Sequence, residues 1–171
     1  APLSMANLAG ELEVAHTTVK SWLEHLKRLY LIFAVPPWSR KIPRGIRKEK
    51  KWYFVDWYYA PEGPARLENM IATYLYRTCL ALTDMGYGSY CLHFVRTLDK
   101  KEIDFIVTRD NQPFLAVEVK SSNAKLSRTL INRHTWFPDA PTIGIQVVNQ
   151  RGVLQKYPDH TWVMSCENFC L

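Results

Sequence analysis

The sequence predicts a mixed α+β protein in which a winged helix-turn-helix precedes a mixed β-sheet flanked by helices. Residues 4–30 carry apolar side chains at helical spacing. Two β-prone runs follow, at residues 31–35 and 52–55, and suit the strands of a wing. Residues 102–107 and 116–120 alternate apolar and charged side chains, which is typical of strands. Helices and strands are therefore both expected.

Composition and charge narrow the classes of function. The 171 residues are 47% hydrophobic, enough for one ordinary core or two small ones. The net charge of +6 favours an acidic partner, nucleic acid first and membrane surfaces second. There is no signal-peptide pattern and no apolar run near the roughly 18 residues of a spanning helix. We expect a soluble, cytoplasmic protein whose four cysteines are reduced thiols.

The first two predicted helices have the spacing of a helix-turn-helix. Ala9 and Val14 stand where a small contact residue and a turn hydrophobe are needed, and Val19 and Trp22 stand at the two inward positions of the second helix. Ala15 occupies the N-cap position, where Ser or Asp is expected. An ordinary helical hairpin with a solvated basic face fits the same pattern. The strands that follow favour the helix-turn-helix.

A basic surface is predicted on the second helix, which would begin near residue 17, and in the loop between the wing strands. That loop carries seven Lys and Arg residues between positions 40 and 51, with only Glu49 opposing them. Such a loop is usually just solvated, but its position beside a helix-turn-helix favours contact with phosphates. We assign Trp52 and Tyr53 to the core. The predicted contacts to nucleic acid, DNA in the first place, are Thr17, Thr18, Lys20, Lys27, Arg28, Arg44, Arg47 and Lys48.

The boundary between two domains is expected in the irregular stretch that ends at Gly63, which gives domains of residues 1–62 and 63–171. Pro64 then suits the first turn of a helix. Glu68 sits at the edge of that helix's apolar stripe. From the residues alone, Glu68 is an ordinary exposed glutamate.

A β-hairpin centred on Asn111 is the natural interpretation of residues 102–120. In that register Asp104 faces Glu118 and Glu102 faces Lys120, all on one side of the sheet. Carboxylates roughly 5 Å apart repel each other unless a cation lies between them or one is protonated. The pattern therefore predicts a metal ion. The alternative is a structural polar face, neutralised by a Glu102–Lys120 pair.

The chain after the hairpin predicts one more helix and further strands. Residues 127–134 are expected to be helical, and residues 142–148 form a buried strand. Residues 162–164 are a candidate edge strand.

Asp104, followed after thirteen residues by Glu118, Val119 and Lys120, resembles the metal-binding core of the PD-(D/E)xK nuclease superfamily, although Ile103 replaces the usual leading proline. The order of segments resembles the C-terminal region of prokaryotic AAA-type ATPases, where a winged helix precedes a nuclease-like domain. These segments are residues 67–71, 93–97, 102–105 and 118–122, and the resemblance runs from about residue 8 to 148.

This resemblance implies a restriction-endonuclease-like fold and a Mg²⁺ or Mn²⁺ ion held by Asp104, Glu118 and Glu68, with the carbonyl of Val119. Lys120 would act in catalysis with Asp104 and Glu118. It also implies an upstream ATPase domain, as in the resembling ATPases. No Gly-rich loop followed by Lys and Ser or Thr occurs in this sequence, so we expect no ATP hydrolysis in it.

Two classes of function stay open: a metal-dependent nuclease carried by a winged helix, and a non-catalytic DNA-binding or docking module of an ATPase. A third interpretation, a protein-interaction domain, predicts no salt-sensitive affinity for DNA.

Overall fold

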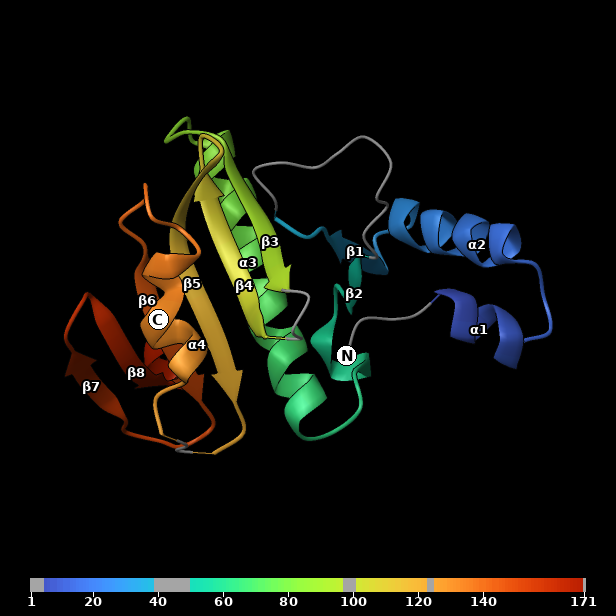
Figure 1. Cartoon of the computed structure of the whole chain (residues 1–171). Helices are drawn as coiled ribbons and strands as arrows, with labels where there is room; N and C mark the ends of the chain where they lie inside the picture. The colour runs from blue at the N-terminus through green and yellow to red at the C-terminus, as the bar shows by residue number, and fades with distance from the viewer. Residues whose placement is uncertain (1–4, 39–49, 97–100, 123–124, 171) are drawn as a thin grey trace.

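The computed structural model describes residues 5–38, 50–96, 101–122 and 125–170. A helical N-terminal part leads into a six-stranded mixed sheet that helices flank, so the predicted fold class is confirmed (Figure 1). No helix in the described part of the chain combines the length and the apolar character needed to cross a bilayer.

The N-terminal part consists of two helices and a two-stranded sheet. Helix α1 (Met5–Glu11) and helix α2 (His16–Arg28) precede the antiparallel strands β1 (Ile32–Val35) and β2 (Lys51–Phe54). Ala15 is the N-cap of α2 and makes no side-chain cap, as expected. A small core of Ala9, Val19, Leu23 and Ile32 joins these helices to β1.

The inward position predicted for Trp22 is wrong. Its side chain is 46% exposed, whereas Leu23 is 7% exposed and packs beside Val19. The reason is the helical period of about 3.6 residues. Leu23, four residues after Val19, lies on the same buried face of α2, whereas Trp22, three residues after Val19, lies outside that face.

The second part begins after the short 3₁₀ helix η1 (Trp57–Tyr59). Helix α3 (Pro64–Asp84) has proline in its first turn, as predicted. The remaining elements are β3 (Tyr90–Arg96), β4 (Glu102–Arg109), β5 (Gln112–Lys120), α4 (Arg128–Ile131), η2 (Asn132–Thr135), β6 (Ile143–Val148), β7 (Leu154–Tyr157), β8 (Thr161–Ser165) and α5 (Cys166–Phe169).

The strand order in the large sheet is β3-β4-β5-β6-β8-β7. Strands β3, β4 and β5 are antiparallel neighbours, and β6 pairs parallel to both β5 and β8. Helix α3 packs on one face and α4 on the other (Figure 1). The core under α3 includes Ile71, Phe105 and Val117, and the core under α4 includes Ile106 and Leu130.

The hairpin of β4 and β5 has the predicted register where Phe105 pairs with Val117 and Ile106 with Ala116. The register shifts by one residue between Val107 and Thr108, so the turn is centred between Asp110 and Asn111 and not on Asn111. Asp110 and Asn111 form its two-residue loop with φ of 50° and 63°. Positive φ at both loop positions matches the twist of the strands, and Asp and Asn tolerate it better than most residues.

Two strands were not predicted, and one was misplaced. No strand was expected at β3 or β7, although Leu92 and Phe94 of β3 alternate with more exposed residues. Strand β8 is not an edge strand, because β7 pairs along its other side. Strand β7 escaped prediction because its pattern is mostly exposed and carries no alternation of apolar residues.

The small sheet packs against the second part of the chain. Phe33 and Tyr53 share a core with Ile71, and the rings of Phe33 and Tyr76 stack at 4.4 Å. The side chain of Asn69 on α3 accepts a hydrogen bond from the Phe54 N–H at 2.9 Å and donates one to the Phe54 carbonyl at 2.8 Å. Strand β2 is therefore fixed to α3, and the division into two domains near residue 62 stays a prediction.

Candidate acidic site

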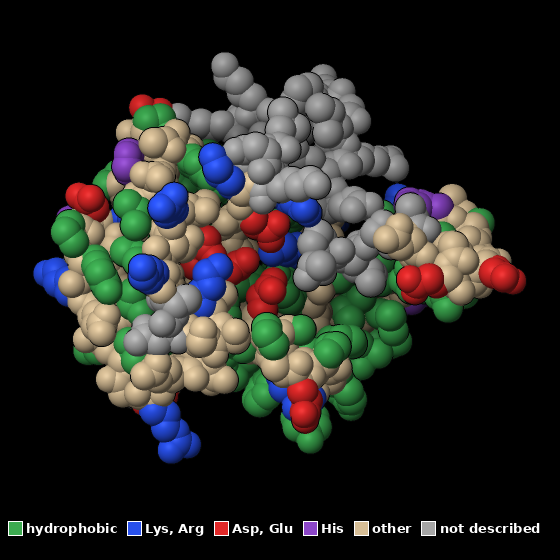
Figure 2. All heavy atoms as spheres, turned by 60° about the horizontal axis from the view of Figure 1, so that its bottom comes forward, with side chains coloured by type: hydrophobic (Ala, Val, Ile, Leu, Met, Phe, Trp, Pro, Cys, Tyr) green, Lys and Arg blue, Asp and Glu red, His purple; other side chains and the backbone are tan. Residues whose placement is uncertain are grey.

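The four acidic-site residues predicted from the sequence lie together. Asp104 projects from β4, Glu118 and Lys120 from β5, and Glu68 from α3. The charges of Glu118 and Glu68 both act on Asp104. Figure 2 shows Asp and Glu side chains gathered near the middle of one face, with Lys and Arg side chains among them. The sheet and α3 thus bring residues separated by 52 positions to one place.

Asp104 and Glu118 are held by their neighbours. The Val119 N–H donates to Asp104 Oδ2 at 2.9 Å. Glu118 is buried, and its Oε1 accepts a hydrogen bond from the Ser127 hydroxyl at 3.2 Å, while Lys120 Nζ lies 3.0 Å from its Oε2. The Gln146 side-chain oxygen accepts from the Ser127 N–H at 2.9 Å, which fixes Ser127 in turn.

The pKa of Asp104 reflects its burial and the repulsion between carboxylates in this site. Burial and the charge of Glu118 raise the pKa of Asp104 to about 7, against the opposing effects of the Val119 N–H and Lys51. Near neutral pH, Asp104 is therefore protonated part of the time. This is the behaviour expected of carboxylates that share a poorly solvated place without full compensation.

Lys51 of β2 lies in the acidic site, a position that was not expected from the sequence. Its Nζ lies 3.5 Å from Glu68 Oε1 and 4.0 Å from Asp104 Oδ1, and it forms a closer ion pair with Glu102 Oε1. Burial acts to lower the pKa of Lys51, but the charges of Glu68, Glu102 and Asp104 outweigh it, so the pKa is raised. Lys51 is a charged lysine at neutral pH.

The placement of Lys51 in the basic loop that we expected to contact phosphates is therefore wrong. Lys51 is 3% exposed and Tyr53 is 7% exposed, whereas Phe54 is exposed. Residues two apart on a strand share a face, so Lys51 must follow Tyr53 inward.

Tyr53 anchors Glu68. Its hydroxyl donates to Glu68 Oε1 at 2.7 Å, and burial together with the Glu68 charge raises the pKa of Tyr53 far above its usual value. Glu68 is only half-buried, yet it has two partners on β2. The interpretation of Glu68 as an ordinary exposed glutamate is wrong.

The expected Glu102–Lys120 pair does not form in the described part of the chain. Glu102 binds Lys51, and its Oε2 lies 3.6 Å from Arg96 Nε, while Lys120 pairs with Glu118 on its own strand. The β4–β5 ladder ends at the Phe105–Val117 pair, so the strands are not paired where Glu102 and Lys120 would meet.

The donor chemistry of this site fits a magnesium or manganese ion. Asp104, Glu118 and Glu68 offer carboxylate oxygens, the ligands that these ions prefer. Within the described residues, no group of three His, Cys, Asp or Glu side chains stands ready to hold a metal ion. Instead, the ammonium of Lys51 lies among the carboxylates. The site thus has suitable ligands, and an internal cation already occupies a place beside two of them.

The predicted nucleic-acid contacts stay a prediction. On α2, Thr17, Lys20, Lys27 and Arg28 are exposed, and Thr18 is half-buried. The positions predicted in the loop, Arg44, Arg47 and Lys48, lie outside the described residues.

Four residues of the site were missed as site residues: Lys51, Tyr53, Ser127 and Gln146. Gln146 offered a signal, because it is a polar residue in the otherwise apolar strand β6 and is fully buried. Lys51 stands two residues before Tyr53, which was assigned to the core, so the strand period indicated its burial; only the packing of β2 on α3 brings both side chains to the carboxylates.

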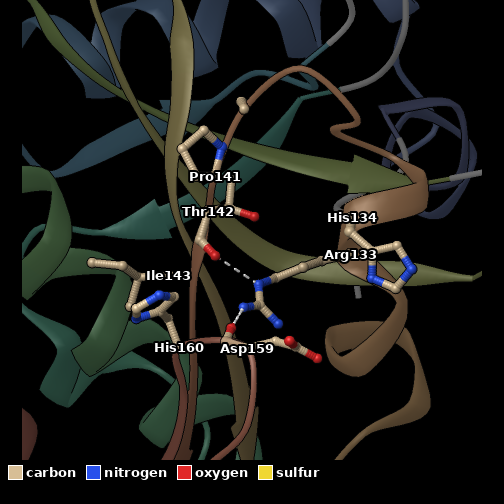
Figure 3. A pocket seen from close by; sticks show the side chains of 8 residues that line it. Arg133, His134, Pro141, Thr142, Ile143, Asp159 and His160 are labelled. Carbon is tan, nitrogen blue, oxygen red and sulfur yellow. Dashed lines mark hydrogen bonds between the residues drawn. The ribbon is translucent and has the colours of Figure 1, made fainter.

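A hollow of about 620 Å³ lies beside Arg133, at the end of β6 that is opposite to the acidic site (Figure 3). Lys120 is level with Val148 at one end of β6, and the hollow adjoins Ile143 at the other. Arg133 is buried and donates to the carbonyls of Thr142, Leu130 and Asp159 and to the Thr161 hydroxyl. These bonds tie η2 to the starts of β6 and β8, which indicates a structural role.

Comparison with known families divides the chain in two. Residues 65–169, more than half of the chain, match a domain of unknown function, DUF4143, and residues 1–57 match another, DUF8612. The chain belongs to the DUF4143 family, whose members often lie in the C-terminal regions of AAA-type ATPases. No curated protein and no solved structure matches the chain.

We expect Gly144→Ala to destabilise the protein by about 1–3 kcal/mol, the cost of overpacking a dense core. An added Cβ would lie 2.9 Å from Arg133 Cζ, and the hydrogen bonds of Arg133 prevent it from moving away. Urea unfolding measures the change. Gly10→Ala is the control, because its Cβ meets nothing within 4 Å and alanine favours α1. Equal stability of the two variants would contradict the role of Arg133.

We also expect stability to depend on Asp104 ionisation. The pKa of Asp104 is about 7 in the folded chain against an ordinary 3.8, so the folded state binds more protons between these values. The free energy of unfolding should therefore fall as pH rises from about 4 to about 7 in chelator. Asp104→Asn should reduce that fall in urea unfolding series, and the exposed Asp84→Asn should leave it unchanged. An unaltered slope in Asp104→Asn would contradict the assignment.

Proposed function

We propose that the acidic site is a metal-dependent, nuclease-like site that cleaves phosphodiester bonds in nucleic acid, with DNA as the first candidate. The observation that carries this proposal is the convergence of Asp104, Glu118 and Lys120 with Glu68 at one place. The order helix, three antiparallel strands, helix and parallel strand, from α3 to β6, supports a restriction-endonuclease-like arrangement.

In this proposal Asp104 and Glu118 would hold the ion with Glu68 and the carbonyl of Val119. A bound Mg²⁺ or Mn²⁺ would polarise the phosphate and lower the pKa of the attacking water. Ser127 and Gln146 fix the orientation of Glu118, and the Val119 N–H fixes that of Asp104. Asp104 and Glu118 would therefore keep their positions whether a divalent ion, a lysine ammonium or a proton neutralises their charge.

Lys120 is suited to a role toward substrate. Its side chain is 39% exposed, while the Glu118 carboxylate that it contacts is 4% exposed. Burial acts to lower the pKa of Lys120. The charges of Glu118, Asp104 and Glu68 act in the opposite direction and outweigh burial, so the pKa is raised. A charged ammonium at the open side of the site would position the water or offset charge that develops on the phosphate.

A second candidate is a non-catalytic DNA-binding or docking module. The burial of Lys51 among the carboxylates favours it, because this lysine compensates their charge without a divalent ion. The two candidates differ in whether the site binds an ion and cleaves.

We expect millimolar Mg²⁺ or Mn²⁺ to raise the melting temperature of the parent chain, since a ligand of the native state stabilises it by mass action. Asp104→Asn should abolish that increase. Lys120→Ala should keep the increase but lower cleavage of plasmid or linear DNA by roughly 100-fold or more, the scale for losing one charge-stabilising group.

The exposed Lys125→Ala is the matched control and should retain cleavage. Glu102 is unsuitable as a control because it binds Lys51. Ion-dependent stabilisation without cleavage of any DNA or RNA tested would favour the docking module.

We expect DNA affinity to fall steeply with salt, because phosphate contacts release counterions. Replacing Arg44, Arg47 and Lys48 by alanine should weaken binding to all sequences alike. Each lost phosphate contact should flatten the slope of log K against log salt by about 0.9. Fluorescence anisotropy at several salt concentrations measures this, with a Lys125→Ala, Lys156→Ala variant as control. An unchanged slope would exclude the loop from the interface.

A further inference from the structure

We infer that Lys51 is an internal competitor of the divalent ion: an ion binds Glu68 together with Asp104 only when the Lys51 ammonium withdraws. This inference rests on the proposed function. It assigns a site residue to the segment that matches the first family, at residues 1–57, although the carboxylates lie in the segment that matches the second, at residues 65–169.

The position of the ammonium carries the first step. Lys51 Nζ lies 3.5 Å from Glu68 Oε1 and 4.0 Å from Asp104 Oδ1, so it stands in the gap that an ion bridging these groups would enter. Two cations that share one gap repel each other strongly where water is scarce. The ammonium and an ion therefore compete for the same carboxylates.

The attachment of Lys51 shows that its position is built into the fold. Its backbone pairs with Val35 of β1, its side chain is 4% exposed, and Nζ lies 5.2 Å from the centre of the Phe94 ring. A buried ammonium is costly unless it is paired, so Lys51 needs the carboxylates, and the carboxylates need Lys51, to offset the cost of burying their charges. A solvated surface lysine would have no such constraint.

The surroundings also offer a way out. A pocket of about 320 Å³ lies between β2, residues 60–61 and α3, and its lining includes Lys51, Glu68, Phe54 and Pro61. The lysine stem has four rotatable carbons and can turn into this space while β2 keeps its pairing with β1. Withdrawal of the ammonium then needs no unfolding of the small sheet.

The test is calorimetric titration of the whole chain with Mn²⁺ alone, which reads affinity without any cleavage. Lys51→Met keeps the apolar stem and removes the charge, and it should bind Mn²⁺ at least roughly tenfold more tightly than the parent, a change of about 1.4 kcal/mol. Lys51→Arg keeps the charge and should not gain this affinity.

Arg96→Met is the matched control. It removes an equal charge from the rim of the same cluster, 3.6 Å from Glu102, and its side chain is 43% exposed. Solvent screens such a pair, so the gain in affinity should be much smaller than for Lys51→Met.

Lys51→Met leaves carboxylates uncompensated, so a second variant guards against misfolding. Lys51→Met with Glu102→Gln removes both members of the closest ion pair and leaves the net charge of the cluster unchanged. It should also bind Mn²⁺ more tightly than the parent.

The outcomes separate the two claims. Tighter binding by both Lys51→Met variants supports the competitor, including when the parent binds no ion at all. If the parent and both variants bind Mn²⁺ with equal affinity, Lys51 does not compete with the ion, while the proposal of a metal site is retained. If neither the parent nor any variant binds Mn²⁺, the competitor and the metal-dependent function both fall.

Discussion

The crowding of carboxylates where β4 and β5 separate is the constraint on which this structure depends. Glu68, Glu102, Asp104 and Glu118 face Lys51, Arg96 and Lys120, so carboxylates outnumber cations by one. Partly buried like charges are costly unless they are compensated. The chain compensates them with a buried lysine and with an Asp104 that binds a proton near neutrality.

This constraint explains why the N-terminal part is joined so closely to the sheet. Lys51 supplies the cation, Tyr53 fixes Glu68, and Asn69 binds both backbone groups of Phe54. The same strand contributes Tyr53 to the main core. Removal of β2 would therefore leave an acidic site without its main cation and a hydrophobic core without one of its walls.

The same arrangement serves both proposed functions, and the difference between them is energetic. Lys51 stabilises the site without an ion, so a divalent ion must interact with the carboxylates more favourably than the ammonium does. Lys51 and the proton on Asp104 offset much of the charge of such a site until a stronger cation arrives, which would suit the proposed nuclease. If no ion displaces Lys51, the same contacts make a permanent structural joint between β2 and the sheet.

The sequence by itself determined the local elements and the pairing of β4 with β5. The helical period gave α1, α2 and α3, and the turn residues between two alternating runs gave the hairpin in which Phe105 pairs with Val117. These follow from interactions between residues close in the chain, which periodicity and turn chemistry report directly. Glu68, in contrast, was placed in the site by the resemblance alone.

Only the tertiary structure decided what surrounds those carboxylates. Lys51 looked like one more residue of a basic loop, and Trp22 looked buried, because a pattern shows which face a residue shares but not what packs against that face. The contacts of Lys51 with Glu102 and Asp104 join strands that lie far apart in the chain. Such contacts depend on how whole elements pack together, and no local pattern encodes them.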